Sequence, residues 1–144
     1  MKVPNPFWRL PALVVAALVL ATGCDPGTGH LVAVHGKVSY QGTAVRRGTI
    51  VFTPDIERGA SGPIARADIQ PDGSYVLSTG DQPGAATGWY RVTITALEPG
   101  LAEAESSFQP ARSYLPDRYR DPELSGLVCQ VLDVPDNSID FNLD

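Results

Sequence analysis

The chain has 144 residues, the length of one ordinary domain, and its 14 Gly and 13 Pro follow no fixed period. This distribution indicates many turns and excludes a collagen-like repeat, while 43% hydrophobic against 19% charged residues argues against wholesale disorder. With 11 basic and 16 acidic residues, the chain has no positive excess with which to displace counterions from a phosphate backbone. We therefore expect no nucleic-acid partner.

The first 23 residues have the pattern of an export signal. Lys2 and Arg9 precede an apolar run over residues 10–23, which is shorter than the roughly 20 residues that span a bilayer but typical of a signal peptide. The run ends in Ala-Thr-Gly before Cys24, which resembles the bacterial lipobox, where the cysteine thiol takes a diacylglyceryl group and becomes the first residue. The sequence predicts a lipoprotein signal peptide over 1–23 and lipidation of Cys24. The alternative is an ordinary signal peptide followed by an incidental cysteine.

Residues 24–30 form a short tether in this interpretation. Six residues from Asp25 to His30 reach at most about 20 Å, so we expect the domain to stay close to the membrane. Removal of the leader leaves 9 basic and 16 acidic residues, a net charge of −7 that provides no attraction to anionic lipids. We expect the chain in the bacterial cell envelope, facing the periplasm or the exterior. Asp25 is a retention signal for the inner membrane in some bacteria, and the choice of membrane stays open.

From Leu31 onward, apolar residues recur at every second position, as in half-buried β-strands. Gln41-Gly42-Thr43 and Pro71-Asp72-Gly73 have the chemistry of turns, and the second predicts a hairpin over 64–79. The polar residues 98–113 predict either a turn of helix or a loop. The count and spacing predict one all-β domain over 31–144, a seven-stranded antiparallel β-sandwich. The predicted strands are 31–40, 49–53, 64–69, 74–79, 89–97, 127–134 and 138–143.

The alternation also predicts the core. Lipidation of Cys24 would leave Cys129 without a partner in the chain, and its place in a strand predicts a buried thiol. Gly36 in the first strand predicts a bulge or close packing. The side chains expected to point inward are Val32, Val34, Val38, Tyr40, Ile50, Phe52, Ala65, Ala67, Ile69, Tyr75, Leu77, Tyr90, Val92, Ile94, Ala96, Ile139, Phe141 and Leu143.

Four strings of this sequence are similar to a known family. Residues 34–54 (VHGKVSYQGTAVRRGTIVFTP), 68–77 (DIQPDGSYVL) and 88–95 (GWYRVTIT) resemble the carboxypeptidase regulatory-like domain, in the version found in small lipoproteins of planctomycete-type bacteria. Residues 115–127 (LPDRYRDPELSGL) also match those lipoproteins. The resemblance covers nearly all of residues 31–144. It implies a transthyretin-like (prealbumin-like) β-sandwich and a non-catalytic binding or spacer module.

The sequence offers few groups for catalysis. His30 and His35 are the two histidines, and together with Cys129 they make a weak set for zinc, which takes three or four ligands. Nucleophile elbows, phosphate loops and dinucleotide glycine patterns are absent. We expect no catalytic residue, no metal and no cofactor. A small hydrolase that uses two acidic loops stays as an alternative, although the loops lack EF-hand spacing; their carboxylates are Asp117, Asp121, Glu123, Asp133, Asp136 and Asp140.

The leading hypothesis is a lipid-anchored, non-enzymatic binding or structural module of the bacterial envelope. Its partners are the membrane, through the lipid on Cys24, and an envelope protein or a glycan. The alternative is carbohydrate or peptide recognition by loops at one end of the sandwich or by an exposed strand edge. Trp89, Tyr114 and Tyr119 are the candidate binding residues. The ligand and the oligomeric state stay open.

Overall fold

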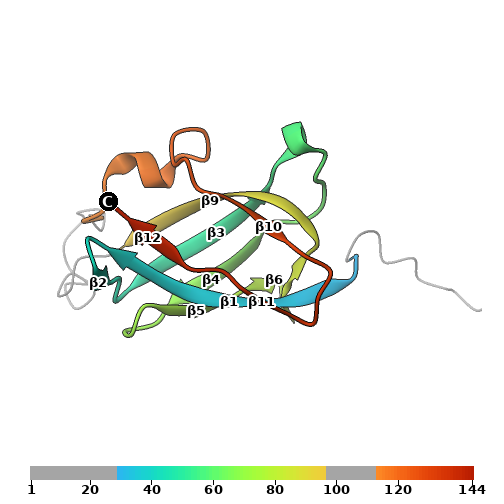
Figure 1. Ribbon diagram of the computed structural model, residues 1–144, viewed down its shortest axis with the longest axis horizontal. Coiled ribbons are helices and arrows are strands. Elements are labelled where there is room, and N and C mark those ends of the chain that lie inside the picture. Colours follow the sequence, from blue (N-terminus) through green and yellow to red (C-terminus); the bar gives the residue numbers. More distant parts are fainter. Residues whose placement is uncertain (1–28, 97–112) are drawn as a thin grey trace, which may run out of the picture.

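The structure is a computed structural model that describes residues 29–96 and 113–144. Residues 1–28, with the predicted signal peptide and Cys24, lie outside the described residues, as does most of the polar segment 98–113. Two sheets pack face to face, so the predicted all-β, sandwich-like class is confirmed (Figure 1). The helices of the described part are two short 3₁₀ turns, η1 (Ile56–Arg58) and η3 (Asp117–Arg120), and neither could cross a membrane.

The first sheet is built around β1 (Leu31–Tyr40), which runs along the molecule in Figure 1. Its antiparallel partners are three short strands, β2 (Thr43–Ala44), β5 (Ser74–Val76) and β8 (Ala85–Ala86). Its parallel partners are β11 (Asp136–Ser138) and β12 (Phe141–Leu143). These parallel pairs correct the prediction of a wholly antiparallel sandwich. The C-terminal segment reaches β1 from the other sheet, so no tight hairpin turn imposes an antiparallel direction on it.

The second sheet is antiparallel throughout. Its strands, in spatial order, are β10 (Val128–Val131), β9 (Gly88–Ala96), β3 (Gly48–Pro54), β4 (Ala65–Ile69), β6 (Ser78–Thr79) and β7 (Gln82–Pro83). Each predicted strand therefore has a counterpart, mostly with shorter bounds, and the short strands β2, β7, β8 and β11 were not predicted as separate elements.

The predicted hairpin over 64–79 is only partly correct. The turn closes as expected, with hydrogen bonds from Gly73 N to Gln70 O (2.8 Å) and from Gln70 N to Ser74 O (2.8 Å). The returning strand then divides, because β5 pairs with β1 in the first sheet while β6 pairs with β4 in the second. Pairing β5 with β1 satisfies backbone groups of β1 between His35 and Lys37 that would otherwise lack partners.

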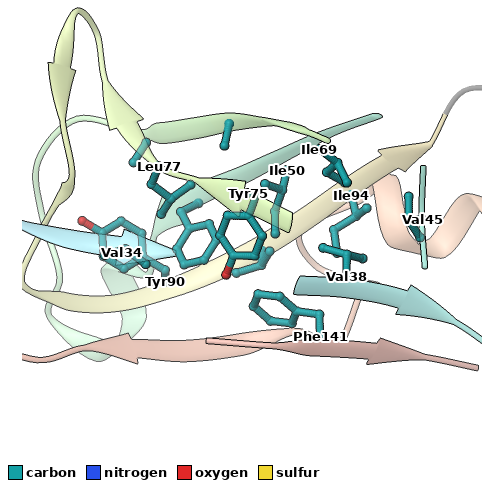
Figure 2. Close-up of a cluster of buried hydrophobic side chains, with 14 of the residues drawn as sticks. Val34, Val38, Val45, Ile50, Ile69, Tyr75, Leu77, Tyr90, Ile94 and Phe141 are labelled. Atoms are coloured by element: carbon teal, nitrogen blue, oxygen red, sulfur yellow. The ribbon is translucent and has the colours of Figure 1, made fainter. Parts of the chain in front are cut away.

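The core lies between the two sheets (Figure 2). Nearly every side chain predicted to point inward is buried there, whereas Tyr40 and Ile139 are partly buried and pack against the cluster. Its centre is aromatic, with ring centroids 5.7–6.5 Å apart at tilted or edge-on angles, a geometry that favours aromatic pairs. The four rings belong to Phe52, Tyr75, Tyr90 and Phe141.

Gly36 allows the C-terminal segment to pass close to β1. A Cβ atom at this position would lie 1.8 Å from the carbonyl oxygen of Ile139, far inside van der Waals contact. Ile139 N donates to His35 O (2.8 Å), and Lys37 N donates to Asp140 Oδ1 (2.7 Å), so the two segments are joined on both sides of the glycine. The close packing predicted for Gly36 is confirmed.

Candidate functional site

The structure separates the predicted binding residues. Trp89 lies at the start of β9, against Arg58 of η1, while Tyr114 packs against Tyr40 at the end of β1 that leads into β2. In Figure 1, the η1 turn (green) and β2 lie at opposite ends of the sandwich. Tyr119 is in η3 and is buried. Cys24 lies outside the described residues. The predicted binding residues therefore do not form one cluster, and the surroundings of Tyr114 and of Trp89 are two separate candidate sites.

A hollow of about 370 Å³ lies at the end of the sandwich where β1 turns into β2. The rings of Tyr40 and Tyr114 stand 6.4 Å apart at 50°, and both are partly buried. Gln41 donates from Nε2 to the hydroxyl of Tyr40 (3.3 Å). We call this site the tyrosine hollow; its lining consists of Tyr40, Gln41, Thr43, Ala44, Arg46 and Tyr114.

Local backbone geometry places the two sides of the tyrosine hollow. Gln41 (φ 51°) and Gly42 (φ 79°) are both left-handed, which is the signature of a two-residue type I′ hairpin turn, so Tyr40 and Thr43 face each other across it. On the other side, the hydroxyl of Ser113 accepts hydrogen bonds from Ala96 N (3.3 Å) and Leu115 N (3.2 Å).

The tyrosine hollow is suited to binding rather than to proton transfer. Burial raises the pKa of Tyr114, and a backbone hydrogen bond and the charge of Arg46 only partly oppose this rise, so the phenol stays neutral at physiological pH. The site offers flat apolar ring faces beside an amide, hydroxyls and a guanidinium. These groups can contact a ligand that has both apolar faces and many hydroxyls.

Sequence reasoning identified Tyr114 but missed its neighbours. It assigned Tyr40 to the core, and it did not select Gln41, Thr43 or Arg46. The signal for Tyr40 was its position immediately before a turn, because a strand's last residue lies at the rim of a sandwich. Its contact with Tyr114, 74 positions later, has no local signal.

Tyr119 has a packing role. It is only 4% exposed, and its hydroxyl accepts from Arg118 (2.8 Å) and from Asp144 N (3.2 Å) and donates to Asp144 O (3.0 Å). The guanidinium of Arg118 lies 4.7 Å from the ring centroid. These contacts fasten the C-terminal strand to η3 and leave almost no tyrosine surface for a ligand.

Trp89 lies beside an ion cluster whose centre is Asp55. This carboxylate is 2% exposed, and its Oδ2 lies 3.2 Å from Arg58 Nε and 3.4 Å from Arg91 Nε, whereas its Oδ1 has no hydrogen-bond partner among the described residues. Arg91 also pairs with Glu123 (2.6 Å) and Glu57. Because the guanidinium of Arg58 lies 4.8 Å from the Trp89 ring centroid, an arginine of this chain covers one indole face.

The carboxylates of the acidic loops pair with nearby arginine and histidine side chains. Asp117 pairs with Arg120, Glu123 with Arg91, Asp133 with His30 (3.7 Å) and Asp136 with His35 (3.0 Å). Across residues 29–96 and 113–144, no three histidine, cysteine or acidic side chains come together as a metal site. Both predicted acidic clusters are thus divided among separate partners.

Cys129 packs against the core from β10, and burial raises its thiol pKa from 9.0 to about 12. A thiol with this pKa is almost wholly protonated near neutral pH, so it is a weak nucleophile. His35 hydrogen-bonds to Asp136 (3.0 Å). The geometry gives no support to a cysteine–histidine pair.

Comparisons of the chain with protein-family models, with curated proteins and with solved structures find no match. The resemblance to the carboxypeptidase regulatory-like domain therefore stays a prediction from the sequence motifs.

Proposed function

We propose that this protein is a non-catalytic, lipid-anchored recognition module of the bacterial envelope, with a transthyretin-like, carboxypeptidase regulatory-like sandwich whose tyrosine hollow binds a carbohydrate. The observation that carries the proposal is the pair of tilted tyrosines, Tyr40 and Tyr114, beside Gln41, Thr43 and Arg46. Binding sites commonly combine apolar ring faces with a few polar groups that orient the ligand.

The position of the tyrosine hollow supports this function. β1 begins next to the predicted tether and ends at Tyr40. At about 3.3 Å per residue, its ten residues separate the two points by about 30 Å. An anchor at Cys24 would therefore hold one end of the sandwich near the membrane and leave the tyrosine hollow at the other.

Glycan-array binding tests the proposal with the full chain extracted in detergent. We expect saccharide binding that Tyr114→Ala weakens at least about tenfold, because aromatic anchors contribute much of the affinity of a small interface. Trp89→Ala is the matched control, since this ring lies at the other end beneath Arg58, and it should bind like the wild type. The absence of saccharide binding across the array, or binding by Tyr114→Ala equal to that of the wild type, would contradict the proposal.

The non-catalytic part of the proposal has its own test. We expect no turnover with a broad panel of glycosidase, esterase and peptidase substrates. Robust turnover that a single substitution abolishes would show that the protein is an enzyme.

A further inference from the structure

The two outer strands of the second sheet differ in how well they are protected against pairing with a further strand. β7 is two residues long and contains Pro83, which has no N–H for a further strand to bind. β10 is four residues long and contains neither Pro nor a charged residue, the usual devices that block pairing at an edge. Of these two edges of the second sheet, β10 is thus the one that is open to another strand.

The register shows which backbone groups of β10 point outward. Val92 N donates to Leu127 O (2.8 Å), so the carbonyl group of Leu127 faces β9, while Leu127 N donates to the hydroxyl of Ser125 (3.2 Å). Because hydrogen-bonded pairs alternate along an antiparallel ladder, Cys129 and Val131 also face β9. The N–H and C=O groups of Val128 and Gln130 therefore point away from the sheet.

Asn137 satisfies the outward backbone groups of this edge at Leu132, and the groups before it have no such partner among the described residues. The side-chain amide of Asn137 accepts from Leu132 N (2.9 Å) and donates to Leu132 O (3.1 Å), which satisfies the next outward-facing residue. Among the described residues, no group hydrogen-bonds to the outward backbone of Val128 or Gln130. Two consecutive outward-facing residues thus keep free donors and acceptors.

The side chains around β10 favour a neutral, apolar contact. Residues 124–132 contain no charged side chain. Four of the seven large hydrophobic residues that are exposed in the described structure lie on or beside this strand, namely Leu124, Val128, Leu132 and Val134. Two copies of an acidic chain can therefore meet here without bringing like charges together.

The free backbone N–H and C=O groups of β10 are complementary to the same groups of a second copy of the chain. A two-fold axis through Cys129 would place Val128 opposite Gln130 of a second copy, and Gln130 opposite its Val128, so that each pair exchanges two hydrogen bonds. We propose that a second copy of this chain adds to β10 edge to edge, and that the two second sheets join into one continuous antiparallel sheet. This dimer is independent of any ligand in the tyrosine hollow.

Sedimentation of the full chain in detergent tests the dimer. Val128→Pro removes an N–H that faces outward without breaking the ladder to β9, so we expect its dimer dissociation constant to rise at least about tenfold, because two of four intermolecular bonds are lost. Val76→Pro is the matched control. Leu77 N binds Val34 O in β1, so the Val76 N–H also faces outward, but from the three-residue edge strand β5, and dimerisation should not change. A monomeric wild type, or a dimer that Val128→Pro leaves intact, would overturn the proposal.

Amide hydrogen exchange tests the register without a substitution. The amides of Val128 and Gln130 should become more protected as the protein concentration rises, whereas the Cys129 amide, which faces β9, should be protected at every concentration. Exchange at Val128 and Gln130 that does not depend on concentration would exclude this edge as the interface.

Discussion

Cys129 illustrates how burial of one side chain couples stability to pH. Its thiol pKa is raised from 9.0 to about 12 by desolvation, so the folded state holds this proton more tightly than the unfolded chain does. The resulting contribution to stability is complete below about pH 9 and is lost as the pH rises from there toward about 12. The pKa values of Tyr75 and Tyr90 are also raised by burial, and they add to the loss above their ordinary value of 10.0.

We therefore predict that the free energy of unfolding of the full chain falls by about 1 kcal/mol between pH 8 and pH 10 under reducing conditions. Urea unfolding at several pH values measures this slope. Cys129→Ala should lose stability by a constant amount from its cavity and should show a shallower fall over the same range, to which the buried tyrosines still contribute. An equal slope in both chains would assign the effect to other groups.

Asp55 is a single buried charge that determines the surroundings of Trp89, a predicted binding residue. The Asp55 carboxylate pairs with Arg58 and Arg91 near the start of β9, and the guanidinium of Arg58 also packs on the indole of Trp89. A buried charge needs such partners, because desolvation without them is costly. Trp89 is consequently part of a packed ion cluster, whereas Tyr114 borders an open hollow.

Among the elements, the link between β10 and β11 depends on one amide. Asn137 is 6% exposed and binds both backbone groups of Leu132, and its Nδ2 also donates to Ala33 O (3.4 Å). It thereby joins the segment that leaves the second sheet to the first strand of the other sheet. A single polar side chain thus stabilises the crossover.

We predict that Asn137→Ala lowers the free energy of unfolding by about 2 kcal/mol, because three hydrogen bonds that each contribute about 0.5–1.5 kcal/mol are lost. Asn142→Ala is the control: this exposed amide accepts one hydrogen bond, from Ser39 (2.7 Å), and its loss should cost less than about 0.5 kcal/mol. Urea unfolding compares the two variants. Equal losses would show that the crossover does not depend on Asn137.

Local patterns predicted the elements better than their pairing. Alternation alone located the buried faces of β1, β3, β4 and β9, since side chains two apart share a face. The division of 74–79 between two sheets and the parallel pairing of β12 with β1 depend on contacts between distant segments. For the same reason the sequence indicated Tyr114 but not its pairing with Tyr40.

At the scale of the whole molecule, β1 connects the proposed functions. It follows the predicted tether in the sequence and runs through the first sheet (Figure 1). It ends at Tyr40, which lines the tyrosine hollow. In our proposal the lipid holds one end of the molecule at the membrane, the other end binds carbohydrate, and the β10 edge between them pairs with a second copy. Both proposed binding functions depend on the folded domain.

The intact mass of the chain extracted from bacterial membranes tests the anchored arrangement most directly. We predict a polypeptide that begins at Cys24, lacks residues 1–23, carries a diacylglyceryl group on the cysteine sulfur and partitions into the detergent phase. A water-soluble chain with an unmodified Cys24, or one that retains residues 1–23, would contradict the account.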